Sequence, residues 1–200
     1  MNNQKISTRV MAGSAMLSAL AVVLQFIEFP IPLLIPPFIK FDLSDLPPLI
    51  GAFAYGPVAG VLIEFIKNLI HCTITKSATV GELSNFILGA CFTATAGLIY
   101  KHNKTKKTAI IGAFTGAIVM GLVSIVSNYF VVYPFYYKAF MPEEVVLSAY
   151  QAILPSVTSV LQCLFIFNLP FTIVKGVICA LIAIPIYKPL RKILKQTDPS

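Results

Sequence analysis

Long apolar blocks, separated by short polar or basic segments, constrain this chain more than any other feature of its sequence. The blocks at residues 8–29, 80–100 and 108–132 each hold the roughly 20 residues that cross a bilayer. Only 12% of the residues are charged, against about 25% in an ordinary soluble domain. A soluble fold of this size still exposes roughly 30% of its chain surface, too much to hide these blocks. We therefore predict an all-α membrane protein with a single domain over residues 1–200.

Basic residues predict the orientation of the helices, because Lys and Arg are retained on the cytoplasmic side of a membrane. Lys5 and Arg9 precede the first block, the segment 101–107 is the most basic loop, and the C-terminal tail carries further basic residues up to Lys195. Placing the N-terminus and the 101–107 loop on one side requires an even number of spans between them, so the short segment 45–55 is counted as a span. The prediction is a six-helix bundle with both termini cytoplasmic and spans at about 8–29, 45–55, 57–74, 80–100, 108–132 and 170–187.

Several function classes lack support in the sequence. The net charge of +7 comes from lysines between apolar blocks and at the chain ends, unlike the basic stripe of a nucleic-acid binder. No GxxxxGK[ST] phosphate loop, HExxH or GxSxG motif is present. No Cys-x-x-Cys pair occurs, so the cysteines are interpreted as packing residues and not as metal ligands. We expect neither an enzyme nor a metal or cofactor site.

A proline-rich apolar segment, residues 30–37, follows the first block. Proline lacks an amide donor and resists helix formation, so we expect an ordered loop that folds back over the protein. Ser44 or Asp45 is suited to cap the helix that begins next.

Polar residues at membrane depth are candidates for function, because an ionisable group there costs roughly 2.5–3.5 kcal/mol on insertion scales. Asn168, Thr172 and Lys175 are spaced i, i+4 and i+7, and so share one face of the last span. They predict a hydrogen-bonding stripe for a polar ligand. The alternative for Lys175 is a side chain that extends to the interface or pairs with Glu82.

The third span carries Glu64, Lys67, Asn68 and His71 on one face. Glu64 and Lys67 are spaced i, i+3 and can neutralise one another, so we interpret them as a structural ion pair inside the bundle. His71 is interpreted as an interface residue near the outer end of the span.

The fourth and fifth spans add further polar groups. Glu82, Ser84 and Asn85 stand where the fourth span begins, and they fit either helix capping or ligand contact. Asn128 requires a hydrogen-bond partner, from another helix or from a ligand. On the predicted topology these groups and the stripe of the last span form an outward-facing pocket beneath the proline-rich loop. Such a pocket suits a flat aromatic ligand with a hydroxylated tail.

Small residues line one face of the first span. Ala12, Ala15 and Ala19 are spaced i, i+3 and i+7, and small side chains allow close approach of helices. The face serves either packing within the monomer or docking of a partner protein.

Four stretches resemble the riboflavin-specific S components of energy-coupling factor (ECF) transporters. They are Phe41-Asp-Leu-Ser-Asp-Leu-Pro47, Gly56-Pro-Val-Ala-Gly-Val-Leu-Ile-Glu-Phe-Ile-Lys-Asn68, Val80-Gly-Glu-Leu-Ser-Asn85 and Asn168-Leu-Pro-Phe-Thr-Ile-Val-Lys-Gly176. The resemblance implies a six-helix bundle in a prokaryotic plasma membrane that binds riboflavin near its extracellular face. Flavin mononucleotide is a second candidate ligand.

The resemblance also implies residue roles and partners. It places ligand contacts at Gly81–Asn85, Asn128, Thr172 and Lys175. The family often has Asn where this chain has Thr172, and Asn168 is the candidate to supply that amide. The alanine face of the first span matches the docking surface for the transmembrane T component, and two cytoplasmic ATPases would power import. The alternatives are an S component for folate, thiamine or pantothenate, and a stand-alone channel or membrane enzyme.

Overall fold

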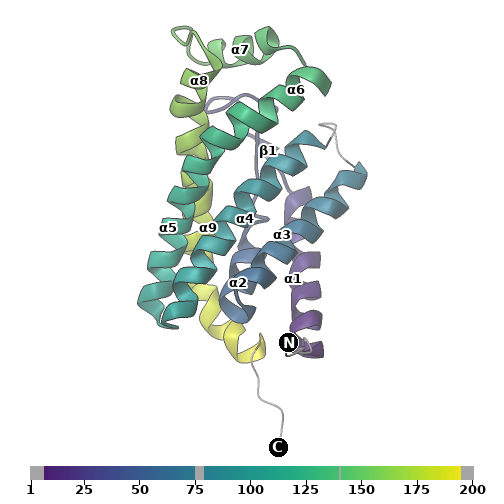
Figure 1. Ribbon diagram of the computed structural model, residues 1–200, viewed down its shortest axis with the longest axis vertical. Coiled ribbons are helices and arrows are strands. Elements are labelled where there is room, and N and C mark those ends of the chain that lie inside the picture. Colours follow the sequence, from purple (N-terminus) through teal and green to yellow (C-terminus); the bar gives the residue numbers. More distant parts are fainter. Residues whose placement is uncertain (1–6, 75–78, 140, 195–200) are drawn as a thin grey trace, which may run out of the picture.

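The computed structural model describes residues 7–74, 79–139 and 141–194 (Figure 1). Lys5 and Lys195, used above to predict the orientation, lie outside these residues. The elements are α1 (Thr8–Phe26), β1 (Phe29–Pro30), β2 (Lys40–Phe41), α2 (Leu46–Tyr55), α3 (Pro57–His71), the 3₁₀ turn η1 (Cys72–Ile74), α4 (Val80–His102), α5 (Lys106–Ser127), the π-helical turn η2 (Asn128–Val132), α6 (Tyr133–Ala139), α7 (Glu143–Gln151), α8 (Val160–Cys163), the π-helical turn η3 (Leu164–Asn168) and α9 (Leu169–Leu194).

Among these described residues, five helical segments are long and apolar enough to cross a membrane: Thr8–Phe26, Pro57–Ile74, Val80–His102, Lys106–Ala139 and Val160–Tyr187. The short span predicted at 45–55 is present as the apolar helix α2, which has 10 residues. At 1.5 Å per residue α2 covers about 15 Å, roughly half of the hydrocarbon core. The described residues therefore form a helical bundle with five candidate spans and one shorter apolar helix.

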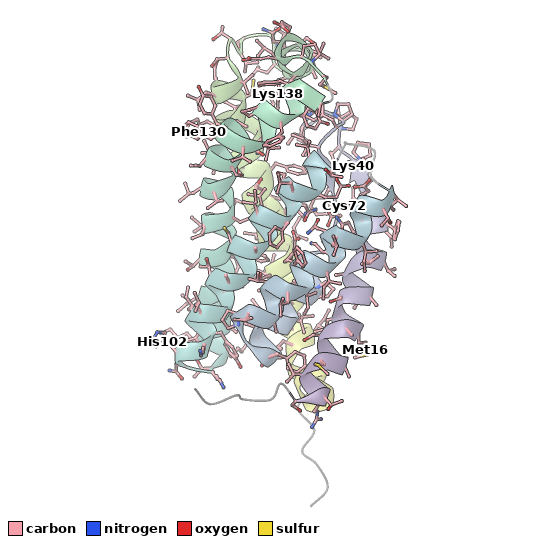
Figure 2. All side chains as sticks on the ribbon, turned by 45° about the vertical axis from the view of Figure 1, so that its right-hand side comes forward. Met16, Lys40, Cys72, His102, Phe130 and Lys138 are labelled. Carbon is pink, nitrogen blue, oxygen red and sulfur yellow. The ribbon has the colours of Figure 1, made fainter. Side chains whose placement is uncertain are left out.

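The helices begin and end near two opposite ends of the molecule (Figure 1). The start of α1, the turn between α4 and α5, and the end of α9 lie at one end of the molecule. Helices α6 and α7 lie at the other end. Figure 2 shows the same separation, with His102 at one end and Lys40 and Lys138 toward the other. The segments predicted to be cytoplasmic therefore share one end of the bundle.

The first span is shorter than predicted, because α1 ends at Phe26 and does not reach Phe29. Phe29 and Pro30 instead pair antiparallel with Phe41 and Lys40, so the proline-rich loop becomes the connection of a small hairpin. The expected loop is thus present, and its two ends are held together by backbone pairing.

Two helices continue beyond their predicted bounds. The helix that begins at Lys106 passes through η2 into α6, so it ends at Ala139 and not near residue 132. The last span, predicted to begin near residue 170, begins at Val160, and the π-helical turn η3 is its one irregular segment. Pro170 does not break it, because Pro170 lies in the first turn after η3, where a missing amide donor is tolerated.

Helices α4 and α5 approach closely where α5 has glycines at positions 112 and 116. A Cβ atom at Gly116 would lie 2.8 Å from the carbonyl oxygen of Phe92, and one at Gly112 would lie 2.8 Å from that of Ala96. Backbone atoms cannot move aside as a flexible side chain can, so the spacing of these helices requires glycine.

Gly116→Val is therefore expected to force α4 and α5 apart and to lower stability by about 1–3 kcal/mol, the usual range for overpacking. The melting temperature of the detergent-purified chain measures the effect. Ile118→Phe adds bulk to an exposed side chain of the same helix and serves as the control. Equal melting temperatures for the two variants would contradict the close approach.

Candidate ligand-binding site

A cavity of about 490 Å³ lies between the hairpin and helices α1, α3, α4, α5 and α9. Cavities that hold small molecules commonly measure roughly 300–1,000 Å³. The structure brings all seven residues predicted to contact a ligand to its wall: Glu82, Ser84, Asn85, Asn128, Asn168, Thr172 and Lys175. Their contact with a ligand stays a prediction.

Apolar and aromatic side chains supply much of the remaining wall. Phe38 and Ile39 come from the hairpin connection, just after the prolines. Phe171 comes from α9, and Tyr133 and Tyr136 come from α6. The hairpin loop thus covers the cavity with apolar groups, as the sequence predicts.

Two asparagines reach the cavity from π-helical turns. Asn128 is the first residue of η2 and Asn168 is the last residue of η3. A π turn holds one extra residue and changes the direction of the side chains that follow it, and such turns are frequent at functional sites. Both of these cavity amides therefore lie at the boundary of a π-helical turn.

Some polar atoms of the wall remain without a partner. Asn85 Oδ1 is buried and accepts no hydrogen bond from the part of the chain that the structure describes. The same is true of Gln25 Oε1 in α1, a cavity residue that the sequence analysis did not single out. Ser84 Oγ donates to Asn128 Oδ1 over 3.3 Å. Because buried acceptors are normally satisfied, Asn85 and Gln25 are suited to receive donors from a ligand.

Lys175 is held by two aspartates of the segment that joins β2 to α2. Its Nζ atom lies 3.0 Å from Asp42 Oδ2 and 3.0 Å from Asp45 Oδ2. The considered pairing of Lys175 with Glu82 is not formed, since Glu82 Oε1 lies 2.9 Å from His71 Nδ1. Glu82 therefore joins α4 to the end of α3, while Lys175 joins α9 to the segment before α2.

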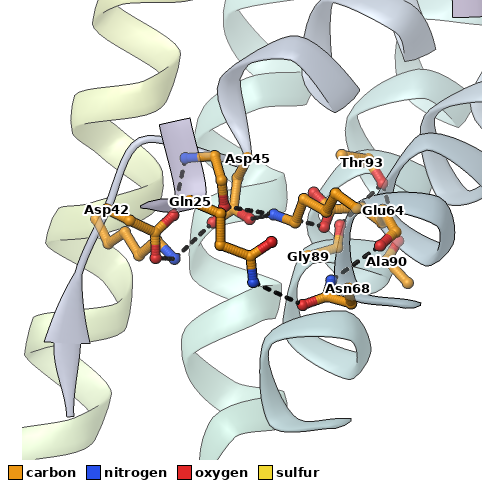
Figure 3. Close-up of polar contacts among 11 residues, drawn as sticks. Gln25, Asp42, Asp45, Glu64, Asn68, Gly89, Ala90 and Thr93 are labelled. Atoms are coloured by element: carbon orange, nitrogen blue, oxygen red, sulfur yellow. Dashed lines mark hydrogen bonds and ion pairs between the residues drawn. The ribbon is translucent and has the colours of Figure 1, made fainter. Parts of the chain in front are cut away.

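The ion pair predicted between Glu64 and Lys67 is confirmed, with Nζ 2.8 Å from Glu64 Oε2 (Figure 3). Lys67 Nζ also lies 2.5 Å from Asp45 Oδ1 and donates to Ser44 Oγ over 2.7 Å. Asp42, Asp45, Glu64, Lys67 and Lys175 thus form one buried ion cluster.

The capping role predicted for Ser44 or Asp45 is wrong. Asp45 occupies the position before α2, but its side chain makes no capping hydrogen bond and contacts the two lysines. An ammonium group buried in the bundle attracts a carboxylate more strongly than a backbone amide does. A signal for this cluster is present in the sequence, which places Lys67, Lys175 and Glu64 at membrane depth. Glu64 pairs with Lys67 in the same span, so Lys175 requires a carboxylate from another segment.

The ion cluster extends toward α1 and α4. Asn68 Nδ2 donates to the Glu64 carbonyl oxygen, and Gln25 Nε2 donates to Asn68 Oδ1 over 3.1 Å. The Glu64 carboxyl group fills the space beside Gly89, where an added Cβ would lie 2.5 Å from it. Hydrogen bonds therefore connect the cavity residue Gln25 with the ion cluster.

The docking residues predicted on α1, Ala12, Ala15 and Ala19, are all exposed. They do not pack within this chain, so the structure leaves the face open to lipid or to a partner protein.

No group of three or more His, Cys, Asp or Glu side chains in residues 7–74, 79–139 and 141–194 is arranged to hold a metal ion.

Comparison with known proteins places this architecture in context. Residues 9–187 match the protein family described as ECF transporter, substrate-specific component. The chain is 37% identical over 182 residues to the riboflavin transporter RibU of Staphylococcus aureus, covering 91% of this chain and 90% of that one. It is 30% identical over 185 residues to the riboflavin transporter FmnP of Bacillus subtilis, covering 91% and 92% of the two chains.

A solved structure shares the fold. It is described as the S component of a bacterial ECF transporter, and it superposes with a TM-score of 0.72 at 35% sequence identity. The match covers 93% of this chain and 97% of that chain.

Lys67→Met is expected to lower the free energy of unfolding by about 3–5 kcal/mol, because it leaves buried carboxylates without their counter-ion. The melting temperature and folded yield in detergent report the loss. The double variant Glu64→Gln/Lys67→Met removes one carboxylate as well, so it should recover part of the lost stability. Lys101→Met at an exposed position is the control. A double variant that melts no higher than Lys67→Met would contradict the charge balance.

Proposed function

The chain belongs to the substrate-specific components of ECF transporters, and we propose that it captures riboflavin at the extracellular side of the plasma membrane for import. The observation that carries the proposal is the cavity, whose wall combines aromatic side chains with buried, unpartnered polar atoms. The aromatic part fits the flat ring system of a flavin, and the unpartnered acceptors fit its ring N–H group and the hydroxyl groups of its chain. Riboflavin is also the substrate in the names of the two relatives.

The proposed binding mode uses polar and aromatic groups from several parts of the cavity wall. The side chains of Asn85, Asn128 and Thr172 offer hydrogen bonds from three helices. Lys175 offers a cation whose position is fixed by Asp42 and Asp45. Phe38 of the hairpin connection and Phe171 of α9 bound the space with aromatic rings. Glu82, Ser84 and Asn168 complete the polar wall.

The orientation in the membrane follows from charge. We place both termini and the basic turn at 101–107 in the cytoplasm, with six passes that count the short α2. Lys40, which lines the cavity, lies toward the opposite end from His102 (Figure 2). With this orientation the cavity opens to the outside of the cell.

Import requires energy that this chain does not supply by itself. We propose that a transmembrane T component docks on the exposed alanine face of α1 and that two cytoplasmic ATPases drive transport. Small side chains support this, because they allow another helix to approach the backbone of α1 closely.

Purified in detergent, the chain is expected to quench the fluorescence of riboflavin. Asn128→Ala should weaken binding roughly 5- to 150-fold, since the loss of a buried hydrogen bond costs about 1–3 kcal/mol. Tyr129→Phe removes a polar group from an exposed neighbour and should bind normally. Competition with folate, thiamine, pantothenate and flavin mononucleotide tests the alternatives. Failure to quench riboflavin, together with binding of another vitamin, would overturn the choice of substrate.

Ala15→Leu is expected to abolish riboflavin uptake in cells that carry the T component and ATPases, while riboflavin binding by the purified variant is unchanged. The added side chain would hold the partner helix away from α1. Leu122→Phe, which adds bulk to an exposed position of α5, should transport normally. Wild-type uptake by Ala15→Leu would exclude this face as the docking surface.

A further inference from the structure

Tyr150 of α7 contacts three residues of the cavity wall, although it does not itself line the cavity. Helix α7 lies at the end of the molecule away from the start of α1 (Figure 1). The Tyr150 side chain is fully buried there. Its neighbours Phe38, Tyr133 and Asn168 all face the cavity. A residue in this position can influence a ligand only through those neighbours.

The polar contacts of Tyr150 form a closed ring of hydrogen bonds. Its hydroxyl group donates to Asn168 Oδ1 over 2.5 Å. The Tyr133 hydroxyl lies 2.5 Å from that of Tyr150, and Asn168 Nδ2 donates to the Tyr133 hydroxyl over 3.4 Å. Because each hydroxyl has one hydrogen to donate, Tyr133 must donate to Tyr150 when Tyr150 donates to Asn168.

The ring of hydrogen bonds determines which atoms Asn168 presents to the cavity. An amide that is free to turn by 180° exchanges its oxygen and nitrogen positions. Here the oxygen is held by the donor Tyr150 and the nitrogen by the acceptor Tyr133. One N–H donor and one lone pair of Asn168 remain, each in a fixed position.

The apolar contacts of Tyr150 reach the loop that covers the cavity. The ring centroids of Tyr150 and Phe38 lie 6.1 Å apart in an edge-on arrangement. The ring of Tyr150 also packs on Phe167 in η3, with centroids 5.2 Å apart. Replacing tyrosine with phenylalanine retains these ring contacts and removes only the hydroxyl group.

The donor role of Tyr150 persists at physiological pH. Burial raises the pKa of the Tyr150 phenol well above its ordinary value, and its neighbour Tyr133 adds to that effect. The hydroxyl therefore keeps its proton.

We propose that Tyr150 is a positioning residue for the ligand, which fixes the Asn168 amide from outside the cavity through the hydrogen-bond ring with Tyr133. This role rests on the proposed function, in which the cavity binds riboflavin. It assigns to α7, a helix outside the candidate spans, a part in determining affinity.

A double-mutant cycle on the purified full-length chain tests the role. Riboflavin dissociation constants are measured by fluorescence quenching for the wild type, Tyr150→Phe, Asn168→Ala and the double variant, together with the melting temperatures of the ligand-free proteins. We expect Tyr150→Phe to weaken binding roughly three- to tenfold. Without the Tyr150 hydroxyl the Asn168 amide is free to turn, and ordering it for the ligand costs about as much as one buried hydrogen bond contributes. In the Asn168→Ala background the same substitution should have no further effect on binding. Tyr129→Phe is the matched control.

The outcomes separate this role from the proposed function. Normal binding by Tyr150→Phe, or an equal loss with and without Asn168, would overturn the positioning role while riboflavin binding by the wild type stands. A wild-type chain that does not bind riboflavin would overturn the proposed function and this role with it. Tyr133→Phe interrupts the same ring and replaces Tyr150→Phe in the cycle if that variant does not fold.

Discussion

The buried ion cluster is the interaction on which the arrangement of the bundle depends. Charged groups at membrane depth are tolerated only when they pair with one another. Lys67 of α3 and Lys175 of α9 share Asp45, and Lys175 also binds Asp42. The segment that bears the two aspartates leads from the hairpin into α2. Pairing therefore holds the loop that covers the cavity to two helices far apart in sequence, and the cavity has a fixed wall without a ligand.

The cavity also has a second, weaker support on the side of α6 and α7. There the hydroxyl groups of Tyr133 and Tyr150 and the amide of Asn168 form neutral hydrogen bonds. These cost less to break than buried ion pairs do. A ligand would thus lie between a wall held by charge and a wall held by tyrosines.

Much of this architecture follows from the sequence, because its signals are local. Bilayer length identifies the spans, and helical spacing places Asn168, Thr172 and Lys175 on one face. The features that were missed are not local. The pairing of Phe29 with Phe41, the contacts of Asp42 and Asp45 with Lys175, and the position of Gln25 depend on residues brought together only by the fold. The π turns leave no periodic signal, since each adds a single residue to an otherwise regular helix.

Those π turns make the site sensitive to chain length in a way that side-chain identity does not reveal. An α-helix rotates by about 100° per residue. Loss of one residue within η2 would restore a regular helix and turn α6 relative to α5 by that angle, so Tyr133 would leave the ring it forms with Tyr150. The same loss before Asn168 in η3 would turn Asn168, Thr172 and Lys175 together by that angle relative to α8, away from their present places in the cavity wall. The number of residues in each π turn is thus as strict a requirement as any side chain in the wall. Related chains that keep this cavity should keep the lengths of η2 and η3 even where their residues differ.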